Sequence, residues 1–166
     1  MTTDLDAVAR QTATARREPE DGPTPTLLYL VGRLDRVVHR AIRDAVRDHG
    51  LSVGQYTALS VLGYRSGLSN AQLARRSLVS PQSAHEVLLS LEQRGLVRRR
   101  AHADHGRILQ TRLTAKGRRT LEACNQQVRE LEHDMVKGLT RHQQTSLRHA
   151  LLSCVHAMHG GLDEEE

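Results

Sequence analysis

The sequence predicts a mainly helical protein that carries one small β-hairpin. The 166 residues include three Tyr and no Phe or Trp, so the core must be aliphatic, which suits helices better than a sheet sandwich. Apolar residues recur at helical spacings of three and four over most of the chain. One stretch, residues 108–113, instead follows the two-residue period of a strand.

The two ends of the chain differ from its body. Residues 1–25 are polar, rich in Thr and Ala, and close with several Pro and Gly residues, which predicts a flexible arm. Residues 160–166 form an acidic tail after a glycine break. We therefore expect one folded domain over residues 26–159.

Long amphipathic helices are expected at both ends of this domain, over residues 27–49 and, in two pieces, over residues 114–158. Gly138 separates these two pieces, and Thr140 is the expected N-cap of the last. The apolar stripes are narrow and heptad-like, which favours dimerisation through these N- and C-terminal helices. A bundle within one chain is the alternative.

Residues 52–113 are built of shorter pieces. Ser52, Ser69 and Ser80 are each expected to cap a short helix, and Pro81 at the first helical position strengthens the third signal. That helix ends before Gly95. Two extended runs follow, around a polar link at residues 101–106, and Thr114 caps the next helix.

Three short helices and a hairpin make a winged helix-turn-helix, with a DNA-binding head over residues 52–113. Charge supports this interpretation. Residues 65–119 hold 12 of the 24 basic residues and three of the 19 acidic ones, giving +9 there and −4 elsewhere. Such clustering is typical of a surface that binds a polyanion.

The candidate DNA contacts follow from how such a head docks, with the N-terminal turns of its third helix in the major groove. The polar positions of that helix can reach bases or phosphates, the hairpin-tip arginine can reach the minor groove, and other arginines can follow the phosphates. These candidates are Arg75, Arg76, Ser80, Gln82, Ser83, His85, Glu86, Arg98, Arg99, Arg100 and Arg107.

At these residues the chain resembles the multiple-antibiotic-resistance-regulator (MarR) family. VSPQS opens the third short helix, LEQRGLV closes it, and RLTAKG follows the hairpin, with the likeness running over about residues 27–158. The resemblance implies a winged-helix homodimer that binds duplex DNA at a pseudo-palindromic site, acting as a repressor of a nearby operon. It also implies release by a small phenolic or anionic ligand.

The chain departs from the family pattern in two places, the hairpin motif and Glu86. The family hairpin reads D-P-x-D-x-R, but here His102 and His105 stand in place of the acids, while Arg107 is kept. The other departure is Glu86, where a basic or polar residue is common. A carboxylate there can accept from cytosine N4, but the preferred interpretation is a salt bridge to a neighbouring arginine.

A ligand cleft between dimer helices and head is the family expectation, and Tyr29, Arg33, His39 and Tyr56 are its candidate lining residues. Cys124 and Cys154 fall on apolar stripes, which predicts buried, unreactive thiols. The histidines, among them the pair His102 and His105, give only a weak signal for a metal site, and surface or interface positions are the preferred interpretation, so no cofactor is indicated.

No catalytic motif and no apolar run long enough for a membrane span occurs in the sequence, so we expect a cytoplasmic non-enzyme. Two other functions remain open. One is an architectural DNA-binding protein without a ligand. The other is a protein-interaction adaptor on the same scaffold.

Overall fold

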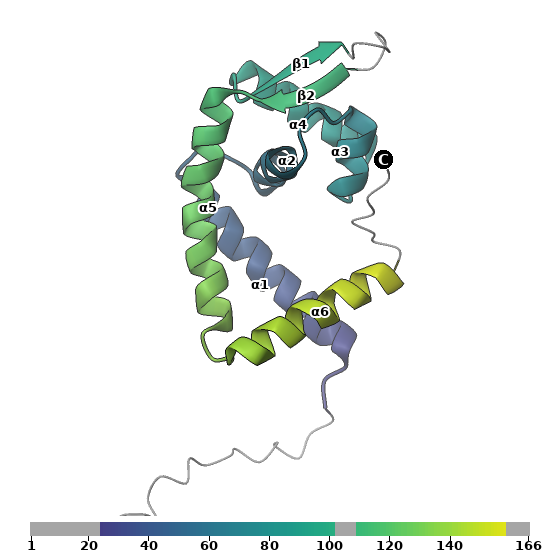
Figure 1. The fold of residues 1–166 in the computed structure, drawn as a ribbon, viewed down its shortest axis with the longest axis vertical. Coiled ribbons are helices and arrows are strands. Elements are labelled where there is room, and N and C mark those ends of the chain that lie inside the picture. The colour runs from purple at the N-terminus through teal and green to yellow at the C-terminus, as the bar shows by residue number, and fades with distance from the viewer. Residues whose placement is uncertain (1–23, 102–108, 159–166) are drawn as a thin grey trace, which may run out of the picture. The chain divides into compact units, whose positions relative to one another are not determined.

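The computed structural model describes residues 24–101 and 109–158 and confirms the predicted fold class (Figure 1). Six helices and one two-stranded antiparallel sheet occur in these ranges. In chain order they are α1 (Leu27–Arg47), α2 (Val53–Tyr64), α3 (Asn70–Arg76), α4 (Pro81–Gln93), β1 (Val97–Ala101), β2 (Leu109–Leu113), α5 (Ala115–Val136) and α6 (Arg141–Ala157).

Each predicted N-cap is confirmed. Ser52, Ser69 and Thr140 each form a capping box, in which a glutamine three residues later returns the hydrogen bond. Ser80 and Thr114 accept from the backbone N–H three residues on. Because these side chains satisfy N–H groups that the helix leaves unpaired, the helices begin where the sequence predicts.

The hairpin pairs β1 with β2 so that Arg99 lies opposite Thr111. Leu68, just before α3, adds a short bridge to Thr111 on the other edge of β2. Thr111 and Leu113 are buried, whereas Leu109 is exposed, so the strand alternation holds only at the end nearer α5. The hairpin is therefore anchored at its base.

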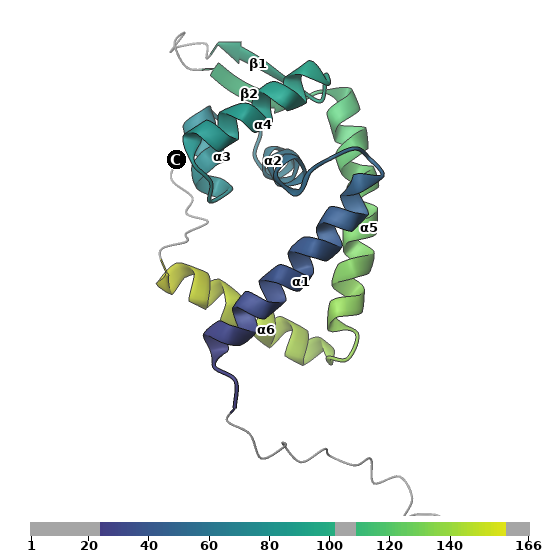
Figure 2. The same ribbon diagram turned by 180° about the vertical axis from the view of Figure 1, so that it is seen from behind.

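The hydrophobic core lies in the head. Helix α2 contacts α3, α4, α5 and β2, and so forms the centre of this part of the molecule (Figures 1 and 2). The core is made of buried aliphatic side chains from α2 and from the segments around it, among them Leu59, Leu62, Leu73, Leu88, Leu91 and Leu96. This core gives α4 and the hairpin a common rigid support.

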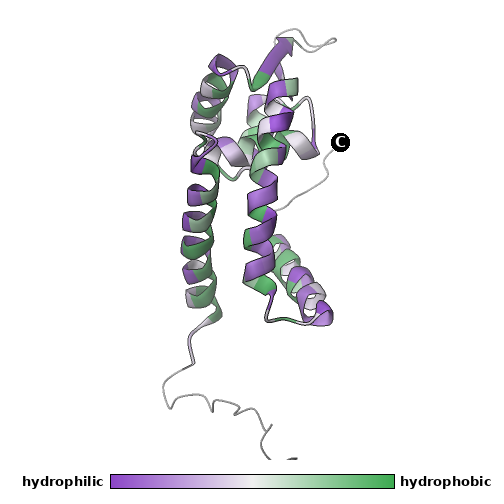
Figure 3. Cartoon of the chain, turned by 90° about the vertical axis from the view of Figure 1, so that its left-hand side faces the viewer, coloured by the Kyte–Doolittle hydropathy of each residue, from purple (hydrophilic) through white to green (hydrophobic). Residues whose placement is uncertain are grey.

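The flanking helices contribute little to this core. Val46 near the end of α1 and Leu121 and Cys124 of α5 are buried, but α6 buries no residue, and the outer side of α5 is largely hydrophilic (Figure 3). The prediction that Cys154 is buried is wrong for the single chain, since nothing in the described part of the chain covers its stripe.

The boundary between two compact units, Met1–Asp35 and Arg36–Glu166, falls within α1. None of the helices in residues 24–101 and 109–158 has both the length and the apolarity needed to cross a bilayer.

Candidate nucleic-acid interface

Helix α4 presents one polar stripe outward and one apolar stripe to the core. Ala84, Leu88 and Leu91 are buried against the rest of the head. The exposed positions of α4 are Pro81, Gln82, Ser83, His85, Glu86, Leu89 and Gln93. This stripe is the surface that an α-helix can offer to base edges in a major groove.

The first turn of α4 carries two exposed hydroxyls that bond to each other. Ser80 Oγ accepts from the backbone N–H of Ser83 at 3.1 Å and lies 2.9 Å from Ser83 Oγ. The bond between the two hydroxyls uses the hydrogen of only one of them. The hydrogen of the other hydroxyl can therefore be donated outward. Next to the positive end of the helix dipole, such a donor suits a phosphate oxygen.

Glu86 does not form the predicted salt bridge among the residues that the structure describes. Its Oε1 instead accepts a hydrogen bond of 3.3 Å from Gln82 Nε2, one helical turn earlier. Because the amide of Gln82 is neutral, this hydrogen bond brings no positive charge to the carboxylate on the outward stripe. The reason is geometric, because the residue one helical turn before Glu86, at position i−4, is Gln82 and not an arginine.

The three consecutive arginines of β1 separate into two groups. Arg98 and Arg100 are exposed on one face of the hairpin. Arg99 points to the other face, where its Nε donates to Glu92 Oε2 of α4 at 2.7 Å. Since successive side chains of a strand alternate in direction, a run of three cannot all face the same partner.

The pairing of Arg99 argues against its predicted phosphate contact. Its side chain is 17% exposed, and the guanidinium bonds to Glu92 through more than one nitrogen. The side-chain hydrogen bond from Arg99 lowers the pKa of Glu92 below its ordinary value. Arg99 therefore ties the hairpin to α4, and only Arg98 and Arg100 of this run remain available to DNA.

The remaining predicted DNA contacts lie elsewhere. Arg75 is exposed and Arg76 is half-buried, both in the last turn of α3. Arg107, together with His102 and His105 of the hairpin tip, falls outside the described residues. Of the basic side chains predicted to contact DNA, Arg75, Arg98 and Arg100 are thus the ones that are exposed within the described residues.

Arg94 is a positioning residue that the sequence analysis missed. At the C-terminus of α4 its guanidinium donates to the backbone oxygens of Gly50 at 2.8 Å and His49 at 3.2 Å. It also bonds to Gln55, whose amide reaches Ser90 of α4 at 2.9 Å. This network fixes α4 to the turn between α1 and α2. No local pattern signals it, because Arg94 and Gly50 are 44 residues apart.

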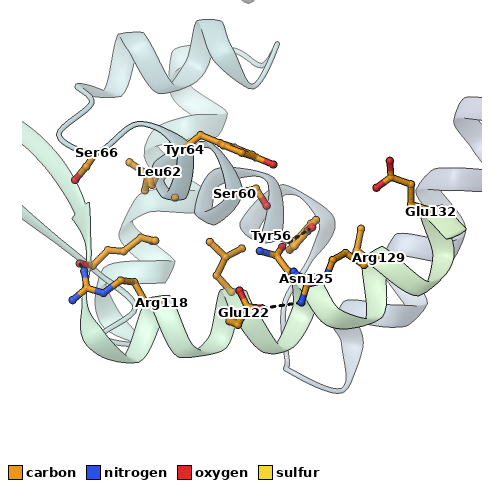
Figure 4. A pocket seen from close by; sticks show the side chains of 14 residues that line it. Tyr56, Ser60, Leu62, Tyr64, Ser66, Arg118, Glu122, Asn125, Arg129 and Glu132 are labelled. Carbon is orange, nitrogen blue, oxygen red and sulfur yellow. Dashed lines mark hydrogen bonds and ion pairs between the residues drawn. The ribbon is translucent and has the colours of Figure 1, made fainter. Parts of the chain in front are cut away.

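A pocket of about 860 Å³ lies between α2, β2 and α5 (Figure 4). Tyr56 Oη donates to Asn125 Oδ1 at 3.0 Å, and burial raises the pKa of the Tyr56 phenol, which keeps it neutral. Arg129 pairs with Glu122 at 2.8 Å, while Arg118 donates to the backbone oxygen of Leu113. Aliphatic, phenolic and guanidinium groups thus line one space.

The four predicted ligand residues do not share this pocket. Of them only Tyr56 lines it, and His39 is exposed on α1 outside it. Tyr29 and Arg33 belong to the other compact unit, where Arg33 Nη1 donates to Tyr29 Oη at 3.3 Å. The sequence does not predict the α5 residues of this pocket, because the apolar stripe of α5 indicates a dimerisation helix. The i, i+4 pair Asn125 and Arg129 is a polar signal beside that stripe.

Comparison with known proteins places the chain among helix-turn-helix regulators. Residues 49–108 match the model of the MarR family. The HTH-type transcriptional repressor Rv2887 of Mycobacterium tuberculosis is 35% identical over 132 residues, covering 80% of this chain and 93% of that protein.

Two solved structures share the fold. The Mycobacterium tuberculosis MarR family protein Rv2887 in complex with salicylic acid has a TM-score of 0.65 at 33% identity, covering 79% of this chain and 97% of that one. A MarR family regulator from Silicibacter pomeroyi has a TM-score of 0.73 at 22% identity, covering 83% and 92%.

Proposed function

The chain belongs to the MarR family, and from this premise we propose that it is a homodimeric repressor that binds a pseudo-palindromic DNA site and is released by a small anionic aromatic ligand. A chromosomal target implies a cytoplasmic protein, and we assign it no catalytic role. Within the domain at residues 26–159, residues 52–113 are the reading head and residues 27–49 and 114–158 the dimerisation helices.

The outward stripe of α4, set in a basic head, is the observation that carries the proposal. Gln82 and His85 are exposed on the first turns of α4, where a docked helix meets base edges. Arg75 of α3 and Arg98 and Arg100 of β1 supply positive charge in the same head, which we assign to phosphate contacts. Ser80 and Ser83 supply hydroxyl donors at the helix start.

We assign the effector to the pocket between α2 and α5. The relative Rv2887 is known in complex with salicylic acid, which carries a phenol and a carboxylate. In this chain the neutral Tyr56 phenol and the Arg118 guanidinium line one pocket, with Leu113 and Leu121 as apolar neighbours for a ring. Since Arg129 is already paired with Glu122, Arg118 is the better partner for a ligand carboxylate.

DNA binding is tested by fluorescence anisotropy on labelled duplexes that tile the DNA upstream of the gene for this chain. One tile should bind roughly a thousandfold or more tighter than a scrambled duplex at physiological salt. The double variant Arg98→Gln/Arg100→Gln should lower the salt slope by about one unit per lost phosphate contact, and Arg119→Gln on α5 should leave it unchanged.

Two outcomes of this assay contradict the proposal in different ways. Equal affinity for every duplex would indicate an architectural DNA-binding protein, because such binding rests on backbone charge alone. Absence of binding even at low salt would indicate an adaptor that uses the scaffold for protein contacts.

Ligand release is tested on the tile that binds. Salicylate should weaken binding, whereas benzyl alcohol, which lacks the carboxylate, should not. Arg118→Gln should remove the salicylate effect and leave DNA affinity unchanged. If salicylate acts equally on this variant, the ligand does not bind through Arg118.

A further inference from the structure

Glu86 has no ion-pair partner among the described residues, and it lies in a segment that is otherwise basic. Residues 65–119 contain two other acids, of which Glu92 is paired with Arg99 and Asp104 lies outside the described residues. Phosphates flank both sides of a major groove, so a carboxylate that enters is repelled unless it meets a hydrogen-bond donor. The position of Glu86 on the outward stripe therefore needs a specific partner.

Gln82 limits the orientation of this carboxylate. Its Nε2 donates to Glu86 Oε1 at 3.3 Å, and both side chains are exposed one turn apart on α4. The bond uses one of the roughly four acceptor sites of a carboxylate. Glu86 Oε2 and the remaining lone pairs stay available, and the group can only accept.

Only some base edges can satisfy an acceptor in the major groove. Guanine offers two acceptors there, and thymine offers an acceptor and a methyl group. Adenine offers its amino group beside the N7 acceptor, which repels a carboxylate, whereas cytosine offers the N4 amino group as a donor. Cytosine is thus the base that fits best.

We propose that Glu86, positioned by Gln82, reads a cytosine in each half of the DNA site. This inference rests on the proposed function, because it requires α4 to enter the major groove. The phosphates repel the Glu86 carboxylate at every DNA sequence, and only a cytosine amino group offsets this repulsion with a hydrogen bond. The contact therefore contributes to specificity by weakening binding to DNA that lacks the cytosine.

The test is selection of bound duplexes from a randomised pool by the full chain, followed by affinity measurements on the winning sequence. The wild type should enrich a cytosine at one symmetric position of each half-site. Replacing that C·G pair by T·A should weaken wild-type binding roughly tenfold to a hundredfold. Glu86→Gln should bind the C·G and the T·A duplex with affinities that differ by less than about twofold. It should also bind random duplexes more tightly than the wild type does, because a negative charge is removed.

Two further variants separate the roles. Glu130→Gln, which removes an exposed carboxylate from α5, should keep the wild-type preference in full. Gln82→Ala should reduce the cytosine preference without abolishing it, because the carboxylate stays but loses its orientation. Thermal unfolding of each variant checks that these exposed substitutions leave the fold intact.

The outcomes are distinct. If Glu86→Gln keeps the cytosine preference, or binds all duplexes more tightly by the same factor, the carboxylate acts only as a repulsive charge. Either result overturns the inference. If the wild type enriches sequences without a fixed cytosine, the inference fails while the proposed function stands. If the wild type enriches no sequence, the proposed function itself fails and takes the inference with it.

Discussion

Leu78 has a left-handed backbone conformation, which residues other than glycine rarely adopt. It follows α3 with a φ of 52°, and its side chain is 76% exposed. The Leu78 N–H bonds to Arg75 O at 3.2 Å and the Val79 N–H to Ala74 O at 3.1 Å, which is the pattern of a helix end that normally carries glycine. The same pattern after α4 does carry glycine, Gly95, with a φ of 68°.

We predict that Leu78→Gly stabilises the fold by about 0.5–1 kcal/mol. Relief of the left-handed strain contributes about 1–2 kcal/mol, and the greater freedom of glycine in the unfolded chain offsets part of it. The exposed leucine side chain loses little packing. Urea unfolding measures the change, and Gly95→Ala should destabilise by a similar amount. Lower stability of the glycine variant would contradict the strain argument.

The Arg99–Glu92 pair gives the head a pH-dependent link between the hairpin and α4. The hydrogen bond from Arg99 lowers the pKa of Glu92 from its ordinary 4.5. A carboxyl with a lowered folded-state pKa contributes stability above its ordinary pKa and loses it as the pH falls through the folded-state value. The link is therefore complete at neutral pH and disappears in acid.

Glu92→Gln should accordingly lower the urea midpoint at pH 7, and the gap to the wild type should close as the pH falls below 4.5. Glu122→Gln removes a similar but more exposed pair with Arg129 and should show little gap at any pH, because exposed pairs contribute little. A gap for Glu92→Gln that stays constant down to acid unfolding would show that charge is not the cause.

At the scale of elements, α5 begins in close contact with the segment that precedes β1. Thr114 N donates to Leu96 O at 3.0 Å, and a Cβ added at Gly117 would lie 1.9 Å from that same oxygen. Both partners are backbone held by the core, so neither can move aside cheaply. The glycine is therefore required for the first turn of α5 to pack on the head.

Gly117→Ala should destabilise the protein by about 3 kcal/mol, the upper part of the range for overpacking a core. Gly138→Ala is the matched control, because nothing lies within 4 Å of a Cβ added there, and its effect should stay within about 0.5 kcal/mol. Thermal and urea unfolding give both values. Equal effects would contradict the close approach of Gly117 to Leu96.

The elements were predictable from the sequence because their signals are local. Ser52 and Gln55, or Ser80 and Pro81, act over a few residues, so the sequence shows where each helix begins. The contacts of the site are not local, as with Tyr56 and Asn125, which are 69 residues apart. Such pairings depend on packing, which periodicity does not encode.

At the scale of the whole molecule, apolar side chains remain exposed on the helices predicted to pair with a second copy. On α1 and α6 they include Leu27, Leu28, Leu30, Val31, Leu147, Leu151, Leu152 and Val155. Contiguous exposed apolar residues on a soluble protein mark an interface more often than scattered ones do. The homodimer that we propose covers such surfaces, and Cys154 lies on the α6 stripe beside Leu151.

Cys154 therefore provides a reporter for the dimer that the chain already contains. In the wild type its thiol should react slowly with a disulfide reagent, and Leu151→Glu should give a monomer in sedimentation with a fast-reacting Cys154. Cys124 is the internal control, because it is 0% exposed and burial raises its thiol pKa, so it reacts only on unfolding in either form. Ser146→Glu on α6 should leave the dimer intact.

The monomeric variant Leu151→Glu should show about half of the wild-type dependence of DNA affinity on salt. The reason is that a single head makes half of the phosphate contacts. A wild type that sediments as a monomer at micromolar concentration, with Cys154 as reactive as in Leu151→Glu, would contradict pairing through α6. The two-headed reading of a pseudo-palindrome would then lack its physical basis, because each head would search and bind alone.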